Sequence, residues 1–133
     1  MSEMSLKSIV NLEHMVFDKI LFTRKGFKNS NSVNNELQVN INKLDDNDDK
    51  YRVTLRLNAD KEDEYEIEII LSGMFRLENN GELDEAKKKI LEGNMVAILM
   101  PYLRSEVSLL TAQPETDSLT LPVINVSSMM NNN

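Results

Sequence analysis

The chain reads Ile98-Leu-Met-Pro-Tyr-Leu-Arg-Ser-Glu-Val107 and, after a polar loop, Leu119-Thr-Leu-Pro-Val-Ile-Asn-Val126, and these two stretches decide its fold. In the first stretch apolar residues recur at the spacing of an amphipathic helix, so Met95 to Thr111 is predicted as the main helix. Pro101 has no backbone donor, and it therefore either lies in the first turns of this helix or kinks it. The second stretch places apolar residues in a connection, where they form either an inner wall against the sheet or an open hydrophobic patch.

A shorter helix is predicted before the main one. Glu82 to Leu91 carries acidic residues in its first turn and lysines near its end, which matches the helix dipole. Gly93 is expected to stop this helix, and Gln113-Pro114 is expected to end the main one.

Four strands are predicted upstream of the helices. The first, Met15 to Phe27, is rich in β-branched and aromatic residues. If its side chains alternate, Ile20 and Phe22 lie on one face and Phe17 and Leu21 on the other. This pattern predicts a strand with both faces partly covered.

The other three strands show apolar and polar residues alternating with period two. Arg52 and Arg56 fall on the polar side of the third strand, so we expect them to form cross-strand ion pairs with the glutamates of the fourth. Gly73 interrupts the fourth strand, which indicates a bulge or a close backbone approach. The apolar positions of the three strands are Leu37, Val39 and Ile41, then Tyr51, Val53, Leu55 and Leu57, then Tyr65, Ile67 and Ile69.

Together these elements predict an α+β fold. It consists of a four-stranded antiparallel sheet, connected as a meander, with a long helix and short helices on one face. Residues 1–133 are expected to form a single domain, which suits their number. Residues 1–13 are predicted to be a disordered arm or a short helix, and residues 127–133 a disordered tail.

The composition excludes several classes of function. A net charge of −7 argues against nucleic-acid binding, because neutralising phosphates requires clustered lysines and arginines. The chain has no cysteine, which excludes disulfides, thiol nucleophiles and zinc–thiolate sites. It shows no signal-peptide pattern and no run of about 18 apolar residues, so we expect a cytoplasmic protein without a membrane span.

Few residues offer catalytic or metal-binding chemistry. Asp45, Asn47 and Asp49 have the first ligand spacings of a calcium loop, but Lys50 stands where that loop needs glycine, so a solvated turn is favoured. His14 is the single histidine, and we expect it to be exposed or lightly packed before the first strand. The glutamates of the fourth strand are expected on its wet face, where nothing raises the pKa of one of them for acid catalysis. We therefore predict that the chain is not an enzyme and holds no metal or cofactor.

Eight methionines are an unexplained feature of so short a chain. A flexible thioether fills irregular gaps in a core, and it also adapts to different partners at a surface. Both uses are compatible with the sequence.

Three motifs resemble those of a known family. Ser72-Gly-Met-Phe75 is similar to a Gly-Gly-Ile-Phe strand exit, and Ile98 to Glu106 is similar to an Ile-Leu-Phe-Pro-Tyr-Ala-Arg-Glu helix start. Leu119 to Asn125 is similar to a Leu-Asn-Leu-Ala-Pro-Val-Asn-Phe crossover loop. These motifs, together with the strand pattern, resemble the SecB family of protein-export chaperones.

The resemblance implies an assembly and a binding site. Members of the family form a homotetramer, a dimer of dimers, with the long helix in the tetramer interface. The crossover loop walls a hydrophobic groove that holds extended segments of unfolded preproteins, without ATP or metal. Carried over by position, the resemblance implies a client groove formed or walled by Phe75, Tyr102, Leu119, Leu121, Pro122, Val123 and Met129.

The resemblance also raises the question of a second partner. The family docks the SecA translocase motor on acidic residues of the first and fourth strands. Lys19 and Thr23 occupy the matching positions of the first strand here, with an acidic residue shifted by one, so docking of SecA is left open. The corresponding acidic face is predicted to comprise Asp18, Glu64, Glu66 and Glu68.

Three functions remain compatible with the sequence. The first is an ATP-independent holdase for unfolded preproteins, serving protein export. The second is a dedicated SecB-like chaperone for one partner, of the toxin–antitoxin type. The third is a carrier of a small apolar molecule. Binding to several unrelated unfolded chains distinguishes the first from the second, and a preference for small apolar ligands distinguishes the third.

Overall fold

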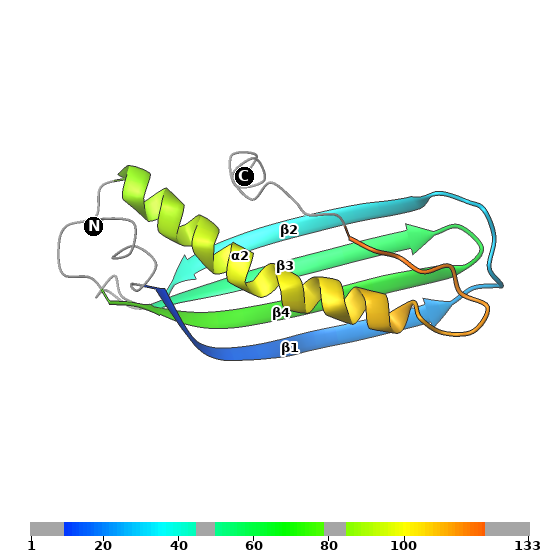
Figure 1. The fold of residues 1–133 in the computed structure, drawn as a ribbon, viewed down its shortest axis with the longest axis horizontal. Coiled ribbons are helices and arrows are strands. Elements are labelled where there is room, and N and C mark those ends of the chain that lie inside the picture. Colours follow the sequence, from blue (N-terminus) through cyan, green and yellow to red (C-terminus); the bar gives the residue numbers. More distant parts are fainter. Residues whose placement is uncertain (1–9, 45–49, 79–84, 122–133) are drawn as a thin grey trace.

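The structure is a computed structural model that describes residues 10–44, 50–78 and 85–121. The strands form one antiparallel sheet, and a helix crosses one of its faces diagonally (Figure 1). The predicted α+β class, with a long helix on a four-stranded antiparallel sheet, is confirmed. In chain order the elements are β1 (Val10–Arg24), β2 (Val33–Lys43), β3 (Lys50–Lys61), β4 (Tyr65–Leu77) and α2 (Glu85–Leu110).

The strands lie side by side in the order β1-β4-β3-β2. β2, β3 and β4 follow one another as neighbours, but β1 pairs with β4 and not with β2. The predicted meander is therefore wrong at one connection, because residues 25–32 carry the chain past two strands, as in a Greek key. Alternating apolar residues identify a strand but not its neighbour, so the sequence pattern could not place β1.

The face of the sheet beneath α2 holds the core. The apolar rows that alternation predicted for β3 and β4 lie on this side and are buried. At Gly73 the helix lies directly against the sheet, since a Cβ added there would be 2.8 Å from Cδ2 of Leu99. The predicted close approach at Gly73 is confirmed, whereas the register shifts of the sheet occur in the pairing of β1.

One of these register shifts, between Phe17 and Lys19, changes which side chains of β1 face the core. Phe17 and Phe22 both pack against the core, whereas Leu21 is exposed and pairs with a residue of the outer face. We predicted Phe17 and Phe22 on opposite faces. That prediction is wrong because a bulge adds one residue and reverses the alternation after it.

Helix α2 is continuous from Glu85 to Leu110, where the sequence predicted two helices separated at Gly93. A glycine inside a helix costs about 1 kcal/mol relative to alanine, and burying one large apolar side chain contributes more than that. Packing along the stripe therefore overrides the glycine, and Pro101 lies inside the helix instead of in its first turns. No separate short helix occurs in the described ranges. The buried stripe runs on both sides of Gly93 and comprises Leu91, Met95, Val96, Leu99, Met100, Leu103 and Val107.

The beginning of the chain also differs from the prediction. Strand β1 starts at Val10 and includes the exposed His14, so the end of the predicted arm is strand. Residues 1–9 lie outside the described residues, as do the predicted tail at 127–133 and the acidic turn at 45–49. Among the described residues, no helix combines the length and apolar character needed to cross a membrane.

Candidate functional site

After α2 the chain bends and runs back along the helix, over the same face of the sheet (Figure 1). We call residues 112–121 the return segment. Glu115 lies at the bend with a φ of 58°, in the left-handed region. Two hydrogen bonds join the apolar part of the segment to the helix and its end: the N–H of Leu119 donates to Oγ1 of Thr111 at 2.9 Å, and Nε of Arg104 donates to the carbonyl of Leu121 at 3.2 Å. The path of this connection is thus set by polar contacts with α2.

The apolar side chains of the return segment point inward. Leu121 is 3% exposed and belongs to the buried core, and Leu119 is half-buried and packs against it. Of the two alternatives for this stretch, these residues form the inner wall and not the open patch. Pro122, Val123 and Met129 lie outside the described residues.

The other two predicted groove residues lie at different depths. Phe75 is 1% exposed and is buried in the core beside Gly73, beneath α2. Tyr102 is 47% exposed on α2. The predicted set is therefore divided into core residues, an inner wall and an exposed helix position.

A buried ion pair lies where the return segment meets the end of the sheet. Lys61 and Glu64 flank the turn between β3 and β4, both side chains are 0% exposed, and Nζ lies 3.2 Å from Oε1. The two carboxylate oxygens of Glu64 accept from different segments: Oε1 from the N–H of Asn29 at 2.8 Å, and Oε2 from the N–H of Asp117 at 2.7 Å. The ammonium of Lys61 donates to the carbonyls of Asn29 and Asn31 at 2.7 and 3.0 Å. The pair thus joins three parts of the chain.

The protonation state of Glu64 follows from its surroundings. Burial raises the pKa of its carboxyl, but the N–H groups of Asp117 and Asn29 and the Lys61 ammonium outweigh burial and hold the pKa below its ordinary value. The pKa of the neighbouring Tyr65 is raised to about 12, first by burial and then by the negative charges of Glu64 and Asp117. Glu64 is therefore charged, and Tyr65 neutral, at physiological pH.

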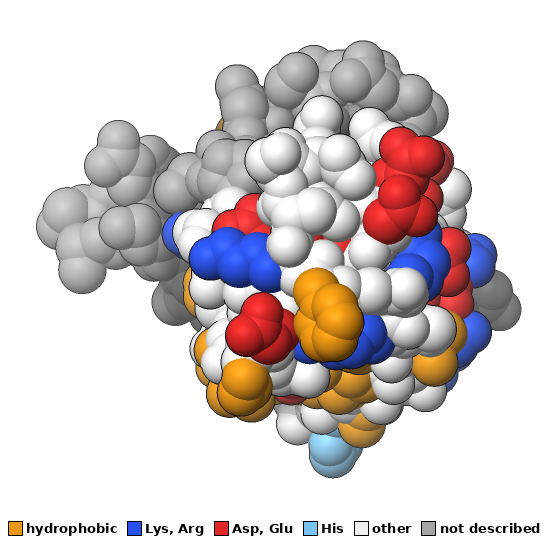
Figure 2. Space-filling model, turned by 90° about the vertical axis from the view of Figure 1, so that its right-hand side faces the viewer, with side chains coloured by type: hydrophobic (Ala, Val, Ile, Leu, Met, Phe, Trp, Pro, Cys, Tyr) orange, Lys and Arg blue, Asp and Glu red, His pale blue; other side chains and the backbone are white. Residues whose placement is uncertain are grey.

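Arg24 makes a second attachment near the same place. Its guanidinium donates to the carbonyls of Gly26 and Glu115, at 2.9 and 3.0 Å, and also bonds the carbonyl of Pro114 and the hydroxyl of Thr116. Figure 2 views this end of the molecule, where basic and acidic side chains alternate over the surface. Together with the buried pair, Arg24 fixes the start of the return segment.

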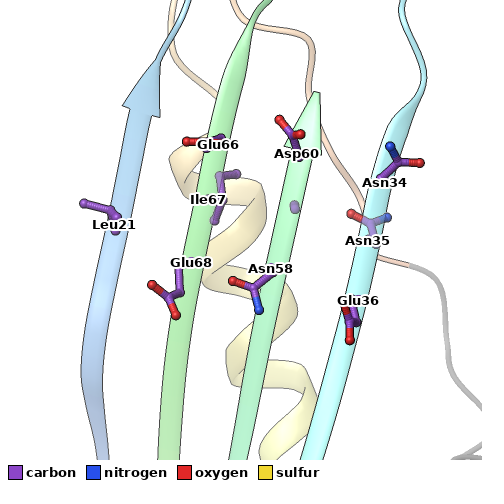
Figure 3. A pocket seen from close by; sticks show the side chains of 10 residues that line it. Leu21, Asn34, Asn35, Glu36, Asn58, Asp60, Glu66, Ile67 and Glu68 are labelled. Atoms are coloured by element: carbon purple, nitrogen blue, oxygen red, sulfur yellow. The ribbon is translucent and has the colours of Figure 1, made fainter. Parts of the chain in front are cut away.

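The outer face of the sheet, opposite α2, carries acidic and amide side chains together with the exposed Leu21. Figure 3 shows a shallow hollow on this face, with Asn58, Asp60, Glu66 and Glu68 along its centre and the helix behind the sheet. Glu68 is paired with Lys19 and with Arg56, each at 2.6 Å, which confirms one of the predicted cross-strand pairs. Hydrogen bonds from these two cations hold the pKa of Glu68 below its ordinary value.

Residues 10–133 match the sequence pattern of the family described as preprotein translocase subunit SecB. This chain belongs to the SecB family. The match includes every described strand, the helix and the return segment, and it confirms the resemblance noted in the motifs. SecB is a family of chaperones and not of enzymes, so the match supports a chaperone function.

Two relatives extend the comparison. Uncharacterized protein MJ0357 from Methanocaldococcus jannaschii is 33% identical over 109 residues, which are 76% of this chain and 66% of that protein, just under two thirds of its length. Among solved structures, the fold is similar to that of the Mycobacterium tuberculosis Rv1957 SecB-like chaperone, in complex with a ChAD peptide from the Rv1956 HigA1 antitoxin. The TM-score is 0.67 at 14% identity, over 92% of this chain and 95% of that chain. At this identity the likeness establishes a shared fold.

The acidic residues assigned by analogy to the SecB docking face do not all lie together. Glu66 and Glu68 line the hollow on the outer face, and Asp18 accepts a hydrogen bond from Oγ of Ser72 at 2.5 Å on the same side. Glu64 is buried, so its predicted outward position is wrong. It precedes β4 and lies in the turn, where strand alternation no longer applies.

The sequence did not lead us to predict the buried pair, although its pattern indicates that Lys61 is buried. Lys61 continues the odd-numbered row of β3 that begins at Tyr51 and points to the core. A lysine in phase with a buried row needs a buried anion, because an unpaired internal charge is costly. The partner could not be read from the sequence, since it depends on the turn and on segments far along the chain.

Proposed function

We propose that this SecB-family chain is an ATP-independent holdase that binds unfolded polypeptides in extended form. The return segment carries the proposal. Leu119 and Leu121 lie beside α2 on the helix side of the sheet, at positions matched to the family's crossover loop. On α2, Tyr102 and Leu109 reach solvent, and their spacing of seven residues places them on one stripe of the helix. The helix side therefore offers apolar contacts to an unfolded client.

Such a surface suits a client without a defined sequence. An unfolded chain presents apolar side chains and unpaired backbone groups, which apolar pockets and strand edges recognise in any sequence of suitable composition. Contacts of this kind use neither ATP nor a metal ion. In the proposed groove, Tyr102 and Leu119 contact the client, and Phe75 and Leu121 support them from the core. Pro122, Val123 and Met129 are assigned to the same groove by their positions in the family motif.

The proposal includes an assembly and a destination. Ile90 is a large apolar side chain exposed on α2, which supports packing of helices between copies in a homotetramer, a dimer of dimers. Clients are proposed to be preproteins in the cytoplasm on their way to export. SecA is proposed to dock on the outer face at Glu66 and Glu68, where it must displace the cations that hold Glu68.

A second candidate function has its own support. The Rv1957 SecB-like chaperone, which shares this fold, was solved with a peptide from an antitoxin. A narrow client range is therefore the alternative, in which this chain serves one partner in a system of the toxin–antitoxin type. The fold is the same in both cases, and only the range of clients separates them.

The absence of tryptophan allows a direct test. The protein is titrated into reduced, carboxymethylated α-lactalbumin and two unrelated unfolded chains that contain Trp, and the client's fluorescence anisotropy is followed. Saturable submicromolar binding to all three supports a general holdase. Binding to none contradicts it and shifts the assignment to the dedicated alternative.

Substitutions locate the binding face in the same assay. Leu119→Ser is expected to weaken client binding about tenfold, because one large apolar contact contributes about 1.5–3 kcal/mol when fully buried. Leu21→Ser, which removes a half-exposed leucine from the outer face, is the matched control and is expected to leave the affinity unchanged. Equal losses in both variants would contradict the helix-side groove.

A further inference from the structure

We infer that the Lys61–Glu64 pair is a positioning device for the client groove: it holds the return segment against the sheet and so sets where the groove wall stands. The inference rests on the proposed function, because a role in positioning the groove wall requires that the groove binds clients. Neither residue belongs to the predicted groove, and neither is accessible to a client.

The first support is the division of bonds at Glu64. One carboxylate oxygen binds the N–H of Asn29, in the connection from β1 to β2, and the other binds the N–H of Asp117, in the return segment. A carboxylate accepts at both oxygens, whereas a glutamine of the same size accepts at only one. Glu64 is therefore suited to hold two donors that approach from different segments.

The second support is the position of these bonds along the return segment. Asp117 lies between the bend at Glu115 and the wall residues Leu119 and Leu121. Downstream, the wall is joined to α2 through Thr111 and Arg104. The Glu64 bond thus attaches the segment on the bend side of the wall, as the Arg24 bonds also do, and the bonds to Thr111 and Arg104 lie on the other side.

The third support is the nature of the pair. Buried ion pairs are often no more stabilising than apolar residues of similar volume, so stability alone does not explain one. Here the two charges bind backbone groups of two other segments: the N–H groups of Asn29 and Asp117 and the carbonyls of Asn29 and Asn31. Apolar residues at positions 61 and 64 would leave these groups unpaired. The pair therefore specifies the arrangement of three segments.

The test compares Glu64→Gln with Glu68→Gln in the full chain. Both changes remove one negative charge at equal size, but Glu68 bonds only side chains of the outer face among the described contacts. Two readouts are taken: hydrogen exchange of the Asp117 and Leu119 amides, with Ile69 in β4 as internal reference, and the affinity for reduced, carboxymethylated α-lactalbumin.

In Glu64→Gln, we expect exchange at Asp117 and Leu119 to accelerate about tenfold relative to Ile69, since a hydrogen bond to a charged group is lost. Client affinity is expected to fall by a similar factor. Glu68→Gln is expected to change neither readout. If the wild type binds the client but Glu64→Gln leaves either the exchange or the affinity unchanged, the positioning role is overturned and the proposed function stands.

Failure of the proposed function has a different signature. If the wild-type chain binds no client, the holdase assignment fails, and a positioning role for a client groove fails with it. If Glu64→Gln does not fold, Arg24→Met provides the second variant, because Arg24 is exposed and holds the same segment at Pro114 and Glu115. The Arg24→Met variant is expected to keep the wild-type exchange rate at Ile69 and to lose client affinity a few-fold. An unchanged affinity would show that attachment of the return segment does not set the groove wall, which overturns the inference.

Discussion

Glu64 and Glu68 stand four residues apart, and each is paired with lysine or arginine, yet their surroundings differ completely. Glu64 is enclosed on the helix side and bonds to segments far away in sequence, whereas Glu68 lies on the outer face among side chains of neighbouring strands. The comparison shows that the same residue type fixes the course of the chain in one place and adjusts surface charge in the other. What separates them is the origin of their partners and their access to water.

The largest difference is expected when each glutamate loses its lysine. Lys61→Met leaves the charge of Glu64 buried without its cation and is expected to lower the free energy of unfolding by about 3–5 kcal/mol. Lys19→Met removes an exposed partner of Glu68 and is expected to have a much smaller effect. Urea denaturation of both variants measures the difference, and losses of similar size would remove the distinction.

A backbone substitution beside the buried pair should have an intermediate effect. A Cβ on Gly26 would lie 2.2 Å from the carbonyl oxygen of Asp63, in the turn that carries Glu64. Gly26→Ala is therefore expected to lower the free energy of unfolding by about 1–3 kcal/mol through overpacking. Lys25→Ala, which removes only the surface pair with Asp60, is the control and should change it little. A neutral Gly26→Ala would show that the turn yields without cost.

Acid should reveal how much the charge of Glu64 contributes to the stability of the fold. The pKa of Glu64 is lowered in the folded state, so its contribution to stability is present above the ordinary value of 4.5 and is lost as the pH falls through the lower folded-state pKa. We expect the free energy of unfolding of Glu64→Gln to fall less than that of the wild type between about pH 5 and pH 3, because this range brackets the ordinary pKa of a glutamate. Burial raises the pKa of Glu92, but this background is the same in both proteins. Parallel pH profiles for wild type and variant would contradict the prediction.

The smallest effect is expected from salt. At about 1 M salt the Debye length is about 3 Å, so exposed pairs are largely screened and buried ones much less. The difference between wild type and Lys19→Met should disappear in high salt, while that between wild type and Lys61→Met should persist. Urea denaturation at low and high salt measures both differences; a salt-sensitive Lys61→Met would indicate that water reaches the pair.

Sequence patterns predicted the parts of this fold that depend on neighbours along the chain. The alternation in β3 and β4 assigned the buried rows correctly, and the motifs at Gly73 and Pro101 led to the right family. The position of β1, the bulge after Phe17 and the continuity of α2 across Gly93 were not predicted, because each is decided by packing between distant segments.

In the candidate site, too, residues with a local sequence signal were predicted and residues that depend on distant segments were not. Leu119 and Leu121 were identified from an apolar stretch in a connection, which is a local signal. Lys61 and Glu64 were not identified as a pair, because their partners at Asn29 and Asp117 come together only in the fold. The alternation of side chains along β4 assigned Glu64 to the wrong face, because a residue in a turn does not follow the alternation of the strand.

The central claim is that unfolded clients bind on the helix side of the sheet. Because the chain has no cysteine, single-cysteine variants Tyr102→Cys and Glu66→Cys can carry an environment-sensitive fluorophore on α2 or on the outer face. The account predicts that reduced, carboxymethylated α-lactalbumin shifts the emission of the probe at position 102 to the blue and leaves that at position 66 unchanged. A shift at position 66 alone would place the client on the outer face and contradict the account.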